Sequence, residues 1–410
     1  MNQELKHNTK CRICDGANLV KILDLGIMPP ANSFLKKEDL SKPEKKFPLV
    51  VYFCENCFLL QLLDVVSPEI LFANYDYMTS ASQPLVSHFI KMADELLETF
   101  SVKKDDLVLE IGGNDGALLK SIKDRCRVLN VDPASNIAAI SRENGVETFN
   151  SFFGSSTGSE ILNKYGEARL VIANNVMAHI DDIRDVFHGI KTLIGDKGIF
   201  VFEVHWVGNL ITEGGFDQIY HEHLCYHSLH DLKYLAESLG LKVFDVKTVP
   251  IHGESMRVFV SKNMQVESSV ENFLDREKSL RLTKKEVFVE FARKVQNGKR
   301  ILHELLSQIR KEGKRIAGYG APAKGNTLLN YYEITPELVS YLTDTTPLKQ
   351  NMYAPGTKIP VVSPDFALKD PPDYFLLLAW NYAEAILRKE DALRKKGIKF
   401  IIPVPEPKIM

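Results

Sequence analysis

LVLEIGGNDG, at residues 107–116, is the segment that best indicates the fold of this chain. Its first half is a short apolar run that is typical of a buried strand, and its second half is a glycine-rich turn. A helix-like segment, residues 117–122, follows, and the next strand-like run, residues 127–131, ends at Asp132. Glycines let the backbone approach a ligand closely, and an acidic side chain at that strand end can bind ribose hydroxyls. The pattern therefore predicts a nucleotide-like ligand here, and the alternative is a plain strand-to-helix turn.

The spacing of the glycines distinguishes between two candidate cofactors, NAD and S-adenosylmethionine. The dinucleotide fingerprint is G-x-G-x-x-G, which residues 112–116 do not match. Glu110, two residues before the first glycine, fits the form E-x-G-x-G-x-G that is typical of methyltransferases, with Asn114 at the central glycine position. We therefore expect S-adenosylmethionine rather than NAD, bound by Glu110, Gly112, Asn114, Gly116 and Asp132.

Strand-like and helix-like segments continue to alternate along the chain. Apolar runs span residues 170–173, 198–204, 241–249 and 256–260. This alternation predicts an α/β fold, with a parallel sheet that is covered on both faces in a Rossmann-like central domain.

The C-terminal part restarts the same pattern. Strands are expected within residues 315–320, 339–342 and 374–379, and a helix within 321–329, which together indicate a second, smaller Rossmann-like domain. Residues 266–310 carry a long charged helical pattern. We interpret it as a helix that bridges two domains, with a coiled-coil partner helix as the alternative.

Two C-x-x-C pairs lie near the N-terminus, Cys11 with Cys14 and Cys54 with Cys57. Two such pairs can bring four thiolates around one tetrahedral zinc ion. Four cysteines leave no open coordination position, so the predicted zinc is structural. Four unrelated thiols are the plain alternative, and a redox role for the first pair lacks the strand-helix pattern of thioredoxins.

Composition excludes several classes of protein. The chain has 410 residues, too many for one compact core, so two or three domains are expected. A net charge of −2 gives no electrostatic case for binding nucleic acid or an anionic membrane. No apolar run is long enough to span a bilayer, and the N-terminus lacks a signal-peptide core. We expect a cytoplasmic protein, as a monomer.

Residues 214–227, GGFDQIYHEHLCYH, hold a dense set of proton-handling side chains. Histidine is the side chain whose ordinary pKa lies near neutrality, and a positioned His or Glu can act as a general acid or base. A metal site, an acid–base site and a plain polar loop all remain open. His221 and His223 are the ligands that a metal-dependent hydrolase would use, but a third ligand in a matching motif is missing.

Several separated motifs occur in a recognisable order. They are the N-terminal C-x-x-C pairs, EIGGNDG (110–116), NNVMAHI (174–180), YHEH (220–223) and GYGAPAKG (318–325). In this order they resemble the nucleotide-sugar C-methyltransferases, S-adenosylmethionine enzymes that make branched deoxysugars. The resemblance covers nearly the whole chain.

The resemblance implies three domains and one reaction. The domains are a zinc-binding domain at 1–77, a class I methyltransferase domain at 78–264, and a linking helix with a Rossmann-like nucleotide-sugar-binding domain at 265–410. The reaction methylates a ring carbon beside a ketone, typically C-3 of a dTDP-linked 4-keto-deoxysugar. Methylation at C-5 or at an oxygen is the alternative.

The resemblance also implies roles for the histidine-rich stretch. His223 is expected to remove the C-3 proton, and Tyr220 and Glu222 to orient the sugar and tune this base. Asn175 and His179 match family positions near the cofactor and the sugar. His221 is expected to be structural, bonded to the backbone.

Further residues of the site are implied in the same way. Asn174 belongs to the cofactor-binding set. Tyr75 and Tyr77 match an aromatic segment that enters the site from the N-terminal domain. Arg257 and Lys324 are expected to contact the substrate, because Arg257 can pair with a carboxylate or phosphate and Lys324 lies at a helix start that suits a diphosphate.

Overall fold

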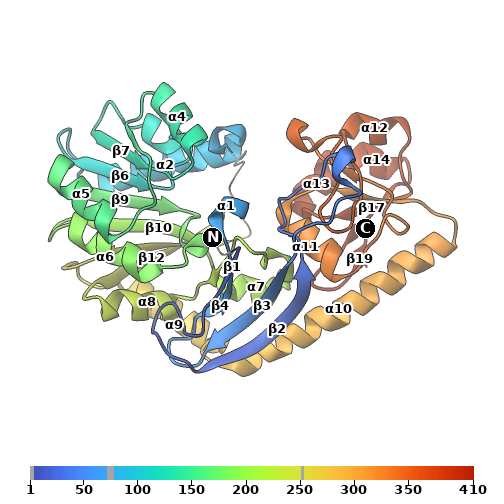
Figure 1. The fold of residues 1–410 in the computed structure, drawn as a ribbon, viewed down its shortest axis with the longest axis horizontal. Coiled ribbons are helices and arrows are strands. Elements are labelled where there is room, and N and C mark those ends of the chain that lie inside the picture. The colour runs from blue at the N-terminus through green and yellow to red at the C-terminus, as the bar shows by residue number, and fades with distance from the viewer. Residues whose placement is uncertain (1–3, 72–77, 251–253) are drawn as a thin grey trace.

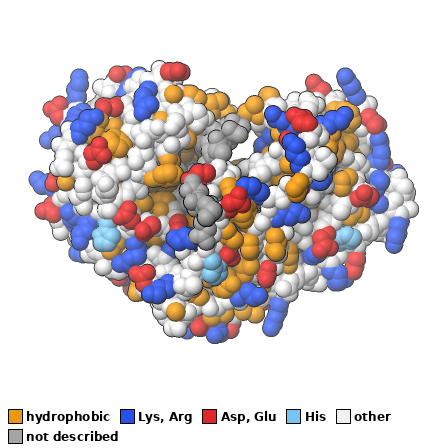
Figure 2. Space-filling model, in the orientation of Figure 1, with side chains coloured by type: hydrophobic (Ala, Val, Ile, Leu, Met, Phe, Trp, Pro, Cys, Tyr) orange, Lys and Arg blue, Asp and Glu red, His pale blue; other side chains and the backbone are white. Residues whose placement is uncertain are grey.

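A computed structural model describes residues 4–71, 78–250 and 254–410 of the chain. A small antiparallel sheet at the N-terminus is followed by a central α/β unit and, after the long helix α10 (Lys285–Lys311), by a C-terminal α/β unit (Figure 1). From the same direction, the molecule is hollowed between the central and C-terminal units (Figure 2).

The central sheet has the strand order β12-β13-β10-β9-β6-β7-β8 in the described chain. Its strands are β6 (Leu107–Ile111), β7 (Arg127–Val131), β8 (Thr148–Phe149), β9 (Ala168–Asn174), β10 (Ile199–His205), β12 (Lys242–Val249) and β13 (Ser255–Ser261). Neighbours from β10 to β8 are parallel, but β13 is antiparallel to both β10 and β12. The prediction of a wholly parallel sheet is therefore wrong at this edge. The connection from β12 to β13 is too short for the crossover that a parallel pair needs.

Helices cover both faces of this sheet. They are α2 (Gln83–Thr99), α3 (Ala117–Lys120), α4 (Ser135–Glu143), α5 (Ser155–Tyr165), α6 (Ile183–Leu193) and α8 (Leu229–Ser238), whereas α7 (Val207–Glu213) packs against α10. Val108 and Ile172 pack in a cluster with residues of α2 and α3, whereas Leu109 and Val171 join the cluster that includes α5 and α6. Successive side chains of a strand point to opposite faces, so runs that are apolar throughout serve two buried faces.

The N-terminal sheet includes a strand from far along the chain. Its order is β11-β4-β3-β2, formed by β2 (Leu19–Met28), β3 (Phe47–Cys54), β4 (Leu60–Leu62) and β11 (Cys225–Tyr226), and β1 (Leu5–His7) pairs separately with β5 (Asp64–Val66). Strand β11 pairs antiparallel with β4, Cys225 opposite Gln61. The histidine-rich stretch therefore ends as a strand of the N-terminal sheet.

The C-terminal unit has its own sheet, β16-β15-β14-β17-β18-β19. Its elements are β14 (Ile316–Tyr319), α11 (Ala323–Tyr331), β15 (Leu342–Thr343), β16 (Val361–Val362), α12 (Pro364–Lys369), β17 (Tyr374–Leu377), α13 (Ala383–Lys389), α14 (Asp391–Lys395), β18 (Lys399–Ile402) and β19 (Lys408–Ile409). All neighbours are parallel except β18 and β19. The predicted Rossmann-like pattern is present.

Short helical turns complete the described chain. They are α1 (Pro68–Leu71), η1 (Lys37–Asp39), η2 (Thr79–Ala81), η3 (Met177–His179), η4 (Phe216–Gln218), η5 (Pro347–Lys349) and η6 (Trp380–Tyr382). No helix in residues 4–71, 78–250 or 254–410 combines the length and apolar character that crossing a bilayer requires.

The long helical pattern forms two helices, α9 (Ser268–Ser279) and α10. Helix α10 is 27 residues long, and it packs against β2, α7 and β14. Its buried side chains, among them Phe288, Phe291, Val295, Leu302 and Leu306, recur at helical spacing. These contacts are the ones that a helix bridging two domains would make, and the domain division itself stays a prediction.

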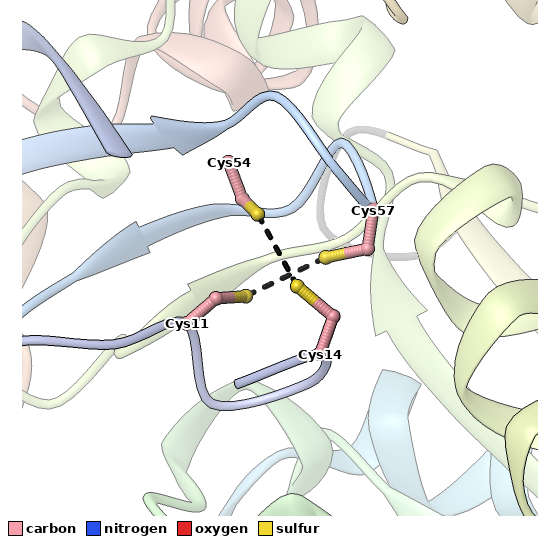
Figure 3. Close-up of side chains that lie close together, drawn as sticks. All are labelled: Cys11, Cys14, Cys54 and Cys57. Atoms are coloured by element: carbon pink, nitrogen blue, oxygen red, sulfur yellow. Dashed lines mark hydrogen bonds between the residues drawn. The ribbon is translucent and has the colours of Figure 1, made fainter. Parts of the chain in front are cut away.

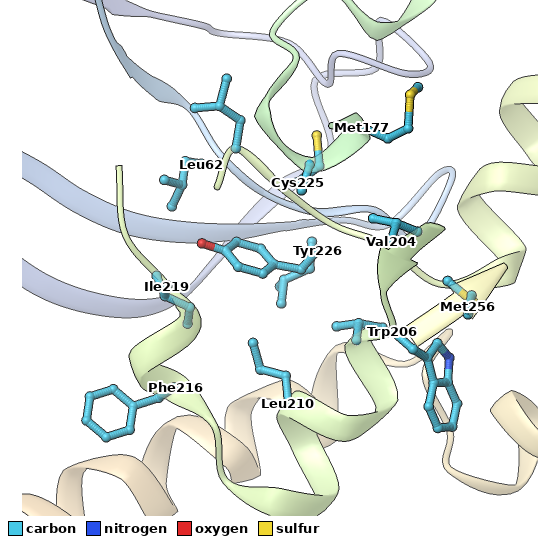
Figure 4. Close-up of a cluster of buried hydrophobic side chains, with 14 of the residues drawn as sticks. Leu62, Met177, Val204, Trp206, Leu210, Phe216, Ile219, Cys225, Tyr226 and Met256 are labelled. Atoms are coloured by element: carbon cyan, nitrogen blue, oxygen red, sulfur yellow. The ribbon is translucent and has the colours of Figure 1, made fainter. Parts of the chain in front are cut away.

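One buried cluster joins the parts of the chain around β11. Figure 4 shows Leu62 of β4 together with Tyr226 of β11, Val204 of β10 and Phe216 of η4. These side chains are at most 7% exposed. The N-terminal sheet, the central sheet and the histidine-rich stretch therefore share a hydrophobic core.

Candidate active site

The glycine turn between β6 and α3 has the backbone that its sequence predicts. Gly112 and Gly116 have positive φ angles of 64° and 76°, which glycine adopts without steric cost. A Cβ on Gly113 would lie 2.5 Å from Asn130 Oδ1, so packing requires glycine there. Asn114 takes the central position with a φ of 53°, in the left-handed region that asparagine tolerates. The departure from glycine is compatible with the turn.

Polar groups without partners gather at this end of the sheet. Both side-chain polar atoms of Asn174, Oδ1 of Asn175 and Oε2 of Glu110 are buried and make no hydrogen bond within the described chain. Strands β6 and β9 are parallel neighbours, so their carboxyl ends share one edge, where open α/β sheets bind ligands. An unsatisfied buried polar group costs about 1–3 kcal/mol. These atoms fit a polar ligand such as S-adenosylmethionine.

Asp132 approaches the turn from the end of β7. Its Oδ2 accepts a hydrogen bond from the Asn114 amide at 3.1 Å, and its Oδ1 accepts one from the Ala134 amide at 2.9 Å. A carboxylate offers about four acceptor positions, so room remains for ribose hydroxyls. Burial raises the pKa of Asp132, and it raises the pKa of Glu110 to about 8. The predicted cofactor residues therefore converge on one edge.

Helix η2 is fixed to the glycine turn. The Thr79 amide donates to Asn114 Oδ1 at 2.9 Å, and the next amide donates to Asp115 Oδ2 at 3.1 Å. Sequence reasoning missed this contact, because no motif indicates that residues 79–80 return to the turn. Tyr75 and Tyr77 lie outside the described residues, so their entry into the site stays a prediction.

Tyr220 and His223 form a hydrogen-bonded pair. The Tyr220 hydroxyl lies 2.7 Å from His223 Nε2, and His223 Nδ1 lies 2.9 Å from the carbonyl oxygen of Gln218. A carbonyl oxygen only accepts, so Nδ1 carries a proton and donates it. In the neutral ring Nε2 then holds the lone pair and accepts from Tyr220. The pair presents a basic nitrogen beside a phenol.

His179 connects this pair with the cofactor edge. It lies in η3, which follows β9, and its ring centroid is 4.9 Å from that of His223. Burial lowers the pKa of His179 to about 4, so the ring is neutral at pH 7. His205 at the end of β10 also lies near His223, with 5.9 Å between ring centroids and the rings tilted by 48°. Sequence reasoning missed His205, which stands in no recognised motif.

Glu222 and His221 have different environments. Burial raises the pKa of Glu222 to about 7, and Asn32 Nδ2 donates to its Oε1 at 2.8 Å. His221 is buried, and its Nε2 donates to the Phe47 carbonyl oxygen at 3.2 Å. The predicted bond from His221 to the backbone is present, and its structural role stays a prediction. Burial also lowers the pKa of His221.

The four predicted metal ligands meet at one point. Their sulfur atoms all lie within 4.8 Å of one another, and Figure 3 shows them directed toward a common centre. The Sγ atoms of Cys11 and Cys57 are 3.5 Å apart, as are those of Cys14 and Cys54. A tetrahedral zinc with bonds of about 2.3 Å places its sulfurs roughly 3.8 Å apart. The donor set and spacing fit zinc.

Electrostatics also favour a cation between these thiols. Hydrogen bonding with Cys54 lowers the pKa of Cys11, whereas hydrogen bonding with Cys11 raises the pKa of Cys54 and of Cys57. Ionising one thiol therefore opposes ionising the others, and a divalent cation reverses that opposition. Among the residues that the structure describes, these four cysteines are the one group of three or more His, Cys, Asp or Glu side chains that lie close enough together to hold a metal ion. His221 and His223 do not form such a group, which disfavours the hydrolase alternative.

Arg257 is placed inside an ion network on the sheet. Its Nε donates to Glu203 Oε1 at 2.8 Å and its Nη1 to Glu95 Oε2 at 3.0 Å, while His88 Nε2 lies 2.8 Å from Glu203 Oε2. The Glu203 carbonyl oxygen accepts from the Asn175 amide at 2.9 Å. Arg257 therefore supports the backbone at the cofactor edge, and its predicted substrate contact stays a prediction.

Lys324 lies at the contact between η4 and the C-terminal unit. Its ammonium group hydrogen-bonds Asn381 and lies 4.9 Å from the ring centroid of Trp380, whose Nε1 donates to Asp217 Oδ2 at 2.7 Å. Burial lowers the pKa of Lys324, and the Asp217 carboxylate opposes that shift. Its predicted role toward a diphosphate is untested by these contacts.

The geometry defines the class of protein. An α/β sheet carries a glycine turn after its first parallel strand and unpartnered polar groups at the same edge, with an acid–base pair beside it. These are the features of a class I S-adenosylmethionine-dependent methyltransferase. Three family models match in succession: a zinc-binding domain at residues 11–72, a methyltransferase domain at 87–246 and a C-methyltransferase C-terminal domain at 250–405.

A relative of known class covers the whole chain. C-methyltransferase NovU of Streptomyces niveus is 37% identical over 405 residues, which is 98% of this chain and 96% of that protein. The chain therefore belongs to the C-methyltransferase family and is an S-adenosylmethionine-dependent C-methyltransferase with a zinc-binding domain.

Solved methyltransferases are also similar to part of the chain. Magnesium protoporphyrin IX methyltransferase of Synechocystis PCC 6803, with bound S-adenosylmethionine, is 11% identical with a TM-score of 0.33, and the match covers 44% of this chain and 81% of that one. An S-adenosylmethionine-dependent methyltransferase of Clostridium acetobutylicum is 15% identical with a TM-score of 0.35, covering 48% and 96%.

Proposed function

We propose that this C-methyltransferase acts on a nucleotide-linked 4-keto-deoxysugar, with dTDP as the nucleotide, and methylates C-3 beside the ketone. The product belongs to the biosynthesis of a branched deoxysugar. The observation that carries the proposal is the contact of the Tyr220–His223 pair with His179, whose η3 turn follows directly on the cofactor edge of β9. A histidine base hydrogen-bonded to a tyrosine, in that place, suits proton removal next to a bound methyl donor.

Carbon methylation needs such a base because carbon offers no lone pair. A neighbouring ketone acidifies the C–H bond and spreads the resulting charge into an enolate. S-adenosylmethionine supplies the electrophilic methyl group when it is bound. His223 receives the sugar proton at Nε2, the ring nitrogen that holds the lone pair. Once that nitrogen is protonated it cannot accept from the Tyr220 hydroxyl, which can then donate to the enolate oxygen.

The neighbouring groups have supporting roles. His179 is neutral at pH 7 and a weak base, so we assign it hydrogen bonding to the sugar rather than proton removal. Asn175 has a φ of 57°, held by its bond to Glu203, and orients the cofactor and the sugar. Lys324 would bind the diphosphate after exchanging Asn381 for a phosphate oxygen. By the family resemblance, Tyr75 or Tyr77 would also belong to the site.

Incubation in heavy water with a panel of nucleotide 4-ketosugars tests this proposal. The enzyme should exchange the C-3 proton for deuterium, and with S-adenosylmethionine it should give a C-3 methyl product by NMR. His223→Ala should retain cofactor binding by calorimetry and lose exchange by about 100-fold or more, the usual range for general base catalysis. Exchange at C-5, or an O-methyl product without exchange, would replace the C-3 assignment.

A further inference from the structure

The segment between the two cysteine pairs reaches the histidine-rich stretch. It connects β2 with β3 and contains the loop at residues 29–35, PPANSFL. Asn32 in this loop donates from Nδ2 to Oε1 of Glu222 at 2.8 Å, across 190 positions of sequence. Glu222 is 7% exposed, whereas the Asn32 side chain remains open to solvent on its other side. The zinc-binding domain thus supplies the one side-chain hydrogen bond that the described chain gives to Glu222.

The C-terminal unit holds this loop in place. Asn326, 1% exposed in α11, donates from Nδ2 to the Ala31 carbonyl oxygen at 2.7 Å. Leu35 and Tyr353 exchange two backbone hydrogen bonds, of 2.9 and 2.8 Å. The residues on either side of Asn32 are therefore fixed, so the amide is presented to Glu222 without the loop having to be ordered first.

A donated hydrogen bond has a definite effect on a buried carboxyl group. It favours the ionised form and lowers the pKa, in opposition to burial, which raises the pKa of Glu222 to about 7. Titratable groups near Glu222 include Tyr220, His221 and His223 on its own segment, and His179 of η3 contacts the Glu222 backbone. Burial lowers the pKa values of His221 and His179, so neither supplies a positive charge at neutral pH. The Asn32 amide is the side-chain donor that holds the carboxylate and favours its ionised form.

We propose that Asn32 is a positioning residue of the methyl transfer that acts through Glu222, so that the zinc-binding domain takes part in setting the proton-handling cluster. This inference rests on the proposed function for its kinetic consequence. The loop lies between the two cysteine pairs in the sequence and contains no metal ligand. The proposal therefore gives the zinc-binding domain a role beyond binding the metal. Loss of the amide should leave Glu222 less ionised and free to rotate beside His223.

A double-mutant cycle separates this indirect role from direct contact with the sugar. The variants are Asn32→Ala, Glu222→Gln and the pair, each measured for C-3 deuterium exchange across pH. Asn32→Ala should lower the exchange rate by roughly 10- to 100-fold, the loss expected for a hydrogen bond to a charged group. The acid limb of the exchange profile should move, because removing the donor raises the pKa of Glu222 and so changes the charge beside the base His223. In the Glu222→Gln background the same change should have no further effect, and multiplicative losses with an unmoved limb would overturn the proposal.

Controls keep this result separate from misfolding. Asn18→Ala removes an exposed side-chain bond to Asn56 in the same domain, and it should match the parent enzyme in rate and pH profile. Zinc content and the melting temperature of Asn32→Ala should equal those of Asn18→Ala. An equal loss of rate in both variants would indicate general loosening of the domain and would overturn the specific role of Asn32.

A substrate-free measurement separates failure of this inference from failure of the proposed function. Infrared difference spectra across pH follow protonation of the carboxyl band that disappears in Glu222→Gln. Asn32→Ala should titrate at higher pH than the parent enzyme, whether or not a ketosugar is the substrate. If the parent enzyme exchanges no ketosugar proton, the proposed substrate is wrong; if the two titrations coincide, the role of Asn32 is wrong.

Discussion

Asn114 has two tasks at the glycine turn, and they constrain its replacement differently. Its backbone lies in the left-handed region, and its side chain accepts the Thr79 amide. Alanine fits neither task. We expect Asn114→Ala to lower the free energy of unfolding by about 2 kcal/mol, as the sum of about 1 kcal/mol of backbone strain and about 1 kcal/mol for the lost hydrogen bond. Urea unfolding measures this change.

Asn114→Gly is the matched variant, because it removes the same side chain but accepts the backbone angle. It should be less destabilised than Asn114→Ala by about 1 kcal/mol. Binding of S-adenosylmethionine by calorimetry should weaken in both, since η2 is released from the turn in both. Equal stability of the two variants would contradict the role of the backbone angle.

Glu110 makes the stability of the cofactor-free protein depend on pH. Burial raises its pKa from the ordinary 4.5 to about 8, so between these values the folded state keeps a proton that the unfolded state has released. The stabilisation by this proton is fully present below pH 4.5 and is lost as pH rises through about 8. The glutamine of Glu110→Gln does not titrate, so the variant lacks this pH dependence. We expect the stability difference between Glu110→Gln and the parent protein to shift in favour of the variant as pH rises from 5 to 8.

Urea unfolding at several pH values checks this prediction. The difference between the two proteins is the informative quantity, because Asp132, Asp217 and Glu222 have raised pKa values too and impose the same trend on both. A difference that does not change with pH would show that Glu110 is ionised throughout.

Strands were easier to predict from the sequence than the contacts between them. β6, β7 and β9 are apolar runs with clear ends, so local pattern was enough. The antiparallel direction of β13 could not be predicted from its apolar pattern alone. The pairing of β11 with β4 could not be predicted either, because β11 is a two-residue strand without periodicity and its partner lies more than 160 positions away. For the same reason the sequence identified Glu222 and His223 but missed Asn32 and His205.

The N-terminal sheet links the zinc ligands to the histidine-rich stretch. Gln61 of β4 donates to Cys11 Sγ at 3.1 Å, and Arg12 donates to both Gln61 Oε1 and the Leu224 carbonyl oxygen, at 3.2 and 3.1 Å. Leu224 follows His223 directly. Loss of the metal should therefore disturb the Tyr220–His223 pair while leaving the glycine turn of the central sheet intact.

Removal of zinc should accordingly abolish methyl transfer and spare cofactor binding. Chelation, with the released ion counted colorimetrically, should give one zinc per chain. The stripped protein should bind S-adenosylmethionine by calorimetry with affinity within a few-fold of the parent. Cys54→Ser should behave in the same way, whereas Cys126→Ser, at a buried cysteine outside the cluster, should keep its zinc. Simultaneous loss of cofactor binding would contradict the separation of the two sites.

The whole molecule is held together by more than its linkers. A single cluster of buried side chains includes Leu49 of the N-terminal sheet, Phe202 of the central sheet, Leu302 of α10 and Phe400 of the C-terminal sheet. Parts that share a core cannot unfold without exposing one another's apolar surface. The three parts are therefore expected to unfold together, although three separate family models match the sequence.

Calorimetry of the metal-loaded protein should show one transition, with equal calorimetric and van't Hoff enthalpies. Leu302→Ala tests the coupling, because this side chain is fully buried in the helix that contacts both the N-terminal and the C-terminal sheets. The truncation should cost about 2–5 kcal/mol and lower the temperature of the whole transition. His303→Ala, next to it but at a half-buried position, should change the transition little. If Leu302→Ala instead splits the transition in two, with one part unmoved, then α10 is a linker between independent domains and the shared core does not couple them.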